Sequence, residues 1–266
     1  MFDASLIEGK FEQIGARLQL QYQSNRALSL DIGRDRNGEF FSLRVNPRSA
    51  GLDALVMDVR PELRHLLLLF RGEELGPTRK SKFLCGHDER FWFVAALPQA
   101  PLSSDVTSAM EALKPGIVIA SQRRAGVKRK DRNRRRNAGF VRQGEWFFVP
   151  EQKLVVPEQE VLCNEPLRRG AGKPHWAELA VRLGGETVWV SREHPNGLSI
   201  TAYQRWLRRH QNSSLTFRQM RRNATLFVKG RISHPDHRTI KLPFWHRVVL
   251  NREGEAPGTP FVAFLD

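Results

Sequence analysis

The chain has 266 residues, of which 40% are hydrophobic, and its 43 Lys and Arg outnumber its 28 Asp and Glu for a net charge of +15. No run reaches the roughly 20 apolar residues of a membrane span, and the N-terminus lacks a signal-peptide pattern, so we predict no membrane partner. Two cysteines, Cys85 and Cys163, lie far apart in the sequence. Such sparse cysteine is typical of a reducing compartment, which predicts a cytoplasmic protein.

The charge is distributed unevenly along the chain. Residues 1–121 carry 15 basic and 15 acidic side chains, whereas residues 122–266 carry 28 basic and 13 acidic ones. The second half therefore holds the whole net charge. A surplus that served only solubility would be spread over the chain, whereas a binding surface concentrates it. The distribution predicts a polyanionic partner for the second half.

The neutral part begins with apolar residues at helical spacing and continues with short alternating runs separated by turn residues. Residues 5–17 predict a helix, and Ser104 with Asp105 predicts the start of a second helix that Pro115-Gly116 ends. The alternating runs predict antiparallel hairpins, one of them with Asn37-Gly38 in its turn and another with the charged sequence GHDE. The predicted strand pairs are 28–32 with 41–45, 54–59 with 63–70, and 82–85 with 90–96. Together these elements predict a neutral, β-rich N-terminal module over residues 1–121.

Residues 122–142, QRRAGVKRKDRNRRRNAGFVR, form the basic segment. It holds ten basic residues, most of them arginine, against one acid, Asp131, for a net charge of +9. Because such a run repels itself, we expect it to stay mobile until a polyanion supplies the opposite charge. If it becomes helical, Arg129, Arg132 and Arg136 share one face. Residues 122–139 are thus predicted to be an Arg-rich linker or binding segment, with a solvated linker or a basic localisation signal as the alternative.

Beyond the basic segment the alternating pattern resumes, and residues 140–266 predict a basic α+β C-terminal module. Hairpins are predicted for residues 140–149 and, around Gly184-Gly185, for residues 176–191. Residues 199–210 and 217–222 are predicted to be helical, and residues 225–250 to form a three-stranded meander. The predicted fold class of the whole chain is α+β, mainly antiparallel β hairpins and meanders with a few short covering helices.

A second basic surface is predicted where arginines alternate with aromatic residues, in RWLRRHQ (205–211) and FRQMRR (217–222). Arginine paired with aromatic side chains suits a groove that follows a phosphate backbone and stacks bases. The alternative is an amphipathic helix whose Trp206 enters the core while its arginines are merely solvated. The six arginines of this predicted surface are Arg205, Arg208, Arg209, Arg218, Arg221 and Arg222.

Three histidines, His234, His237 and His246, lie close together in the sequence with Asp236 between the first two. Two imidazoles could act as base and acid on an RNA 2′-hydroxyl, and three could bind zinc. Their order and spacing fit neither a zinc-finger pattern nor the HExxH helix, and histidines in turns are common, so we predict no metal and no cofactor. They remain the candidate catalytic residues if the protein is a ribonuclease-like phosphodiesterase.

The sequence therefore predicts a nucleic-acid-binding protein, with RNA favoured over DNA because arginine both pairs with phosphate and stacks on exposed bases. We expect it to bind structured RNA as part of a ribonucleoprotein. The alternatives are an RNA-processing enzyme or nuclease that uses the histidines, and a DNA-binding or packaging protein. The predicted nucleic-acid-binding residues are Arg123, Arg124, Lys128, Arg129, Lys130, Arg132, Arg134, Arg135 and Arg136, with the six arginines of the second surface.

Overall fold

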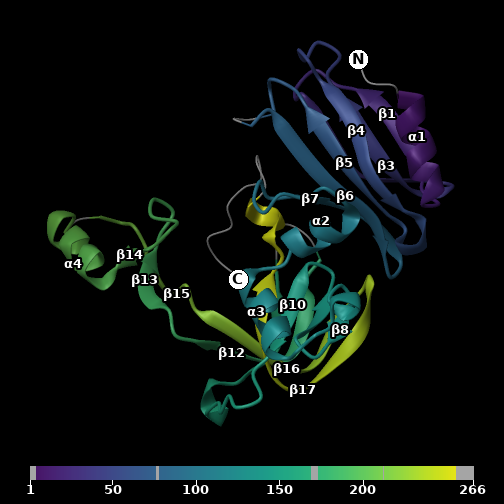
Figure 1. Cartoon of the computed structure of the whole chain (residues 1–266). Coiled ribbons are helices and arrows are strands. Elements are labelled where there is room, and N and C mark those ends of the chain that lie inside the picture. Colours follow the sequence, from purple (N-terminus) through teal and green to yellow (C-terminus); the bar gives the residue numbers. More distant parts are fainter. Residues whose placement is uncertain (1–3, 76–77, 169–172, 212, 256–266) are drawn as a thin grey trace. The chain divides into compact units, whose positions relative to one another are not determined.

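The computed structural model describes residues 4–75, 78–168, 173–211 and 213–255 (Figure 1). It confirms the predicted α+β class, with mainly antiparallel strands and four α-helices among these residues. None of the helices in this part of the chain is long and apolar enough to cross a membrane. The chain divides into two compact units. The first comprises Met1–Phe147, Asp236–Arg238 and Val249–Phe261, and the second comprises Phe148–Pro235, Thr239–Val248 and Val262–Asp266.

The first unit contains two sheets built from hairpins. One sheet has the order β1-β3-β2, with β1 parallel to β3, and the other has the order β4-β5-β6-β7. The β2–β3 register runs to Asp35↔Gly38, and Gly38 adopts a φ of +100°, which favours glycine at this turn. The strands are β1 (Leu18–Tyr22), β2 (Leu28–Asp35), β3 (Gly38–Val45), β4 (Asp53–Arg60), β5 (His65–Arg71), β6 (Lys80–Asp88) and β7 (Phe91–Ala96), with a 3₁₀ turn at Pro61–Leu63.

Strand β5 lies at the centre of this unit, because its residues are buried on both faces. Leu66, Leu68 and Phe70 join one core cluster that also contains residues of helix α1 (Ala4–Gln13). Leu67 points into a second cluster, which contains residues of helix α2 (Val106–Ala112). Each fully buried side chain of this size contributes about 1.5–3 kcal/mol, so the continuous apolar run of β5 holds both layers together.

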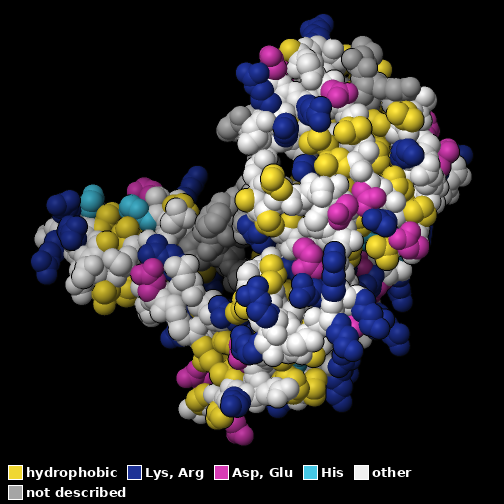
Figure 2. All heavy atoms as spheres, in the orientation of Figure 1, with side chains coloured by type: hydrophobic (Ala, Val, Ile, Leu, Met, Phe, Trp, Pro, Cys, Tyr) yellow, Lys and Arg dark blue, Asp and Glu magenta, His cyan; other side chains and the backbone are white. Residues whose placement is uncertain are grey.

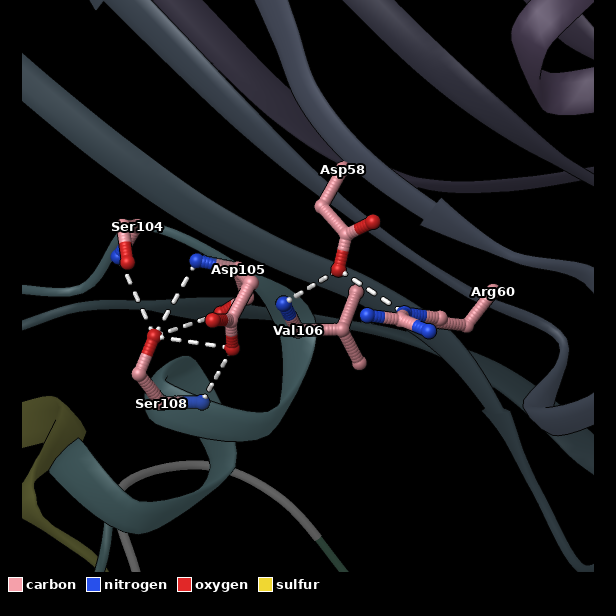
Figure 3. Close-up of polar contacts among 6 residues, drawn as sticks. All are labelled: Asp58, Arg60, Ser104, Asp105, Val106 and Ser108. Carbon is pink, nitrogen blue, oxygen red and sulfur yellow. Dashed lines mark hydrogen bonds and ion pairs between the residues drawn. The ribbon is translucent and has the colours of Figure 1, made fainter.

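Helix α2 is fixed at its N-terminus by side chains (Figure 3). Asp105 is the N-cap and accepts a hydrogen bond from the Ser108 N–H at 2.7 Å, which lowers the pKa of the Asp105 carboxyl group. One residue on, the Val106 N–H donates to Asp58 on β4 at 2.9 Å, and Arg60 donates to the same carboxylate. The helix predicted from Ser104 and Asp105 is therefore confirmed, and its N-terminus is attached to β4.

After α2 one more helix leads into the basic segment. Helix α3 (Gly116–Arg124) follows directly, with Pro115 in an extended conformation as its N-cap. The sequence did not predict this helix, because Pro115-Gly116 was assigned to the end of α2. A 3₁₀ turn at Arg129–Asp131 and strands β8 (Arg136–Asn137) and β9 (Phe140–Gln143) complete the segment. A final 3₁₀ turn covers Arg252–Glu255.

The largest sheet has seven strands in the order β11-β12-β16-β17-β10-β9-β8, and β11, β12, β16 and most of β17 belong to the second unit. Strands β11 and β16 pair antiparallel with the two edges of β12. The predicted meander over 225–250 is wrong in one respect: its last two strands are a single strand, which continues through Pro243. The bounds are β10 (Trp146–Pro150), β11 (Leu162–Leu167), β12 (His175–Leu183), β16 (Thr225–His234) and β17 (His237–Leu250), with a 3₁₀ turn at Glu158–Glu160.

Residues 186–222 form a smaller substructure at one end of β12 and β16, which we call the α4 module. The β12–β16 pairing ends at Leu183↔Thr225, and pairing resumes between β13 and β15 at Glu186↔Arg222. A long antiparallel ribbon therefore carries the module at its end (Figure 1). Its elements are β13 (Glu186–Val190), β14 (Leu198–Ser199), α4 (Ile200–Arg209) and β15 (Arg218–Arg222), and its sheet has the order β14-β13-β15.

Two predictions in this region are wrong. Residues 176–183 and 187–191 do not pair with each other, because Gly184-Gly185 bends one side of the ribbon instead of closing a hairpin. Gly185 has a φ of +77°, and a Cβ there would lie 2.5 Å from the Arg222 carbonyl oxygen. Residues 218–222 are a strand and not a helix, whereas the helix predicted over 199–210 is confirmed with Ser199 as its N-cap.

Candidate nucleic-acid interface

The part of the basic segment from the last residues of α3 to the first residue of β8, residues 123–136, is called the basic loop. The basic loop does not form a single helix. The sequence predicted a mobile segment, whereas the loop is bonded to other parts of the chain. Its two ends are joined at the base, where Ser121 Oγ donates to the Gly139 carbonyl oxygen at 2.8 Å. The approach is close: a Cβ on Gly139 would lie 2.7 Å from the Gln122 Cα, so this position needs glycine.

Buried polar side chains hold the middle of the basic loop. The side chain of Lys114 is only 3% exposed, and its ammonium group donates to Glu111 at 2.6 Å. The same Nζ donates to the Arg132 carbonyl oxygen at 2.8 Å and to Asn133 Oδ1 at 2.7 Å. Gln122 Nε2 also donates to the Arg132 carbonyl oxygen, at 2.7 Å. Burial lowers the pKa of Lys114, and the bond to Glu111 opposes this shift.

The only acid of the loop also has a structural role. Asp131 Oδ1 lies 3.1 Å from Arg134 Nε, and the Asp131 carbonyl oxygen accepts from Asn137 Nδ2 at 3.3 Å. Asn137 Oδ1 in turn accepts from the Gly139 N–H at 2.9 Å. These short-range bonds fold the second half of the loop back onto β8. The backbone is thereby fixed although the side chains around it have like charge.

Arg135 is the one predicted binding residue of the loop that points into the fold. It forms ion pairs with Asp88 and Glu89 at the β6–β7 turn, and Asp88 also accepts from Arg142 at 3.2 Å. Burial lowers the pKa of Arg135, and the negative charge of Asp88 opposes that shift. The carboxylates of this turn therefore compensate Arg135 and Arg142, and these two arginines position the loop.

The other predicted cations of the loop are exposed to solvent. Because the backbone is fixed, the side chains leave it from defined positions, and little conformational entropy of the backbone remains to be lost on binding. Lys and Arg side chains gather around β8 in the space-filling view (Figure 2). The exposed residues are Arg123, Arg124, Lys128, Arg129, Lys130, Arg132, Arg134 and Arg136.

The second predicted basic surface lies on the α4 module, and its six arginines differ in environment. Arg205, Arg208 and Arg209 are exposed on α4, and Arg218 and Arg221 are exposed on β15. The sixth, Arg222, is half-buried. It pairs with Glu186 at 2.7 Å and donates to the Asn196 carbonyl oxygen at 2.9 Å, so its contacts lie within the module.

The three candidate catalytic histidines have different local environments. His234 ends β16, and its ring stacks on that of His175 with centroids 4.2 Å apart. His237 begins β17, three residues later, and its Nδ1 lies 3.6 Å from Glu89 Oε2. Burial lowers the pKa of His237. His246 is buried within β17 and stacks on Phe244, with its Nδ1 2.8 Å from the Phe244 carbonyl oxygen. His246 thus has the surroundings of a packing residue.

The chain matches no protein-family model, no curated protein and no solved structure.

Sequence reasoning missed the residues that hold the basic loop and the partner of His234. Lys114 precedes a proline and has no pattern that separates it from a surface lysine. Asp88 and Glu89 were visible only as a charged turn, and their arginine partners lie about fifty residues further along the chain. His175 is a single histidine before a strand. No local signal marks any of these contacts.

Proposed function

We propose that the protein binds structured RNA through the basic loop. The observation that carries this proposal is the set of eight exposed Lys and Arg side chains on a loop whose backbone is fixed by Lys114, Gln122 and Arg135. Such an arrangement costs electrostatic self-repulsion in the free protein, and a polyanion relieves it. Phosphate groups are the polyanionic partner that suits arginine best, because its planar guanidinium makes two parallel hydrogen bonds to them.

RNA is favoured over DNA because folded RNA exposes unpaired bases beside its phosphates. Six of the eight exposed cations are arginine, which stacks on bases as well as pairing with phosphate. On this proposal the protein acts in the cytoplasm as part of a ribonucleoprotein. Both cysteines are free thiols, one buried and one exposed, which suits a reducing compartment.

The salt dependence of binding tests the proposal. The protein is titrated into a fluorescent hairpin RNA, and into a duplex DNA of the same sequence, at several salt concentrations. If the exposed cations contact about six to eight phosphates, affinity for the RNA falls by at least about a thousandfold between about 50 and 200 mM salt. An affinity for RNA that does not depend on salt contradicts the proposal, and tighter binding to the DNA at equal salt favours a DNA-binding protein.

A further inference from the structure

The α4 module has an aromatic cluster with little buried core. Among its described residues only Val188 and Ser191 are buried, and α4 itself has no buried residue. Trp189 stacks on Tyr203 with centroids 5.0 Å apart, and Phe217 lies 4.8 Å from Trp206. Aromatic rings usually bury most of their area in a core. Here the rings, some of them on α4 itself, form a layer that is only half-buried, so part of their surface stays open to solvent.

His210, at the C-terminal end of α4, is the most exposed ring of this layer. Its ring stacks on Trp206 with centroids 4.6 Å apart and an interplanar angle of 16°. Its Nδ1 lies 2.9 Å from the Trp206 carbonyl oxygen, and its backbone N–H donates to the same oxygen at 3.0 Å. An exposed ring held by a stack and by the contact of its Nδ1 is a preformed flat surface, and a ligand that stacks on it need not order it first.

A groove beside His210 supplies positive charge and hydrogen-bond donors. It is lined by Arg208, Arg209, His210, Gln211 and Ser213, so this set of described lining residues contains no carboxylate. The whole module has seven arginines and two glutamates, a net charge of +5. Lys, Arg and His side chains gather over α4 in Figure 2. A fixed ring beside two guanidinium groups suits a ligand that combines an aromatic face with phosphate groups.

We propose that this groove binds a single-stranded segment of nucleic acid. One base stacks on His210, and the phosphates on either side of it pair with Arg208 and Arg209. Because every base has an aromatic face, such binding tolerates any sequence. An acidic protein surface would form ion pairs with the arginines, but it would offer no flat ring to stack on His210. The inference rests on the ring and the groove of the second unit, so it does not depend on the basic loop of the first.

The test uses the full chain and a short single-stranded RNA that contains 2-aminopurine, whose fluorescence falls when it stacks on another ring. We expect quenching on binding to the natural protein. His210→Ala is expected to weaken binding by about fivefold or more and to reduce the quenching. Arg208→Ala with Arg209→Ala is expected to lower the slope of log affinity against log salt by about 1.4, the value for two contacts to a single strand.

Matched variants make the result specific. His210→Phe loses the contact with the Trp206 carbonyl oxygen but keeps a flat ring. Because stacking needs only the ring, this variant should bind nearly as well as the natural protein. Two control variants should leave both the affinity and the quenching unchanged. They are Gln204→Ala, on the same helix, and Arg34→Ala with Arg36→Ala, in the first unit. The proposal is overturned if His210→Ala binds as well as the natural protein, if a strand without bases binds equally well, or if polyglutamate displaces the RNA.

The same probe separates this inference from the proposed function. A variant of the basic loop that no longer binds hairpin RNA should still quench the 2-aminopurine strand. If hairpin binding is absent from the natural protein and quenching is present, the proposed function fails and this inference stands. If hairpin binding is present and no variant of the groove alters single-strand binding, this inference fails and the proposed function stands.

Discussion

Replacing Arg129, Arg132, Arg134 and Arg136 with alanine is expected to lower the affinity for hairpin RNA by about three orders of magnitude at physiological salt. All four side chains are exposed on the basic loop, and Arg135 is omitted because it pairs with Asp88 and Glu89. Each lost phosphate contact removes about 0.9 from the slope of log affinity against log salt, or about 3.6 for four. At about 0.15 M salt this slope corresponds to the thousandfold loss, which a fluorescence titration measures directly.

A matched control separates the loop from the net charge of the protein. Arg26, Arg34, Arg36 and Arg48 are also exposed arginines, in the neutral part of the chain. Their replacement removes the same four charges, and we expect a much smaller effect, because none of these side chains belongs to the basic loop and a charge that makes no phosphate contact releases no counterion. If both sets of changes lower the affinity equally, general charge is responsible and the basic loop is not the interface. If neither does, the loop is only a linker.

Lys114→Met is expected to destabilise the first unit by about 2–4 kcal/mol, because it removes one partner from a set of buried polar groups. The Glu111 carboxylate, the Arg132 carbonyl oxygen and Asn133 Oδ1 each lose a hydrogen bond that the ammonium donates. The loop would then lose its fixed backbone while keeping all of its exposed charge. RNA binding should therefore weaken by much less than in the arginine variant, since ordering of the loop is added to the cost of binding.

Urea denaturation followed by two spectroscopic probes measures this loss of stability and shows whether the two units unfold together. The double variant Lys114→Met with Glu111→Gln provides the control. It leaves no uncompensated carboxylate beside the apolar side chain, so it should recover part of the stability. Unfolding of Lys114→Met at the same urea concentration as the natural protein would show that Lys114 does not hold the loop.

Local patterns predicted much of the fold. The N-cap Asp105 and the turn at Gly38 each depend on neighbours within a few residues. The predicted GHDE turn is displaced, because Gly86, His87 and Asp88 belong to strand β6 and pair with β7. Errors arose where one local pattern serves two structures. A proline is typical both just after the end of one helix and at the start of the next. Pro115 is the N-cap of α3. Gly184-Gly185 has the composition of a hairpin turn, and in the fold it bends a strand whose partner lies some forty residues away.

The charge of the candidate site was predictable, and its conformation was not. The order of residues in the sequence shows that the cations of residues 123–136 form one run. Their repulsion predicts a mobile chain when only the run itself is considered. The buried Lys114 and the acids at Asp88 and Glu89 reverse that conclusion, because they bond to the loop from outside it. Which acid meets which arginine is decided by packing between distant elements, and no spacing in the sequence encodes it.

The paired positions Leu183 and Thr225 have a consequence for how this protein can be altered. They stand opposite each other at the end of the β12–β16 pairing, so the chain leaves and returns to the sheet at adjacent points. Closing that gap needs only a short turn, because adjacent antiparallel strands are joined by two-residue loops. The 41 intervening residues, 184–224, thus behave as an insertion in a hairpin, and surface hairpins accept such exchanges readily. A foreign domain with close termini could be grafted in its place, and the register of β12 and β16 would stay the same.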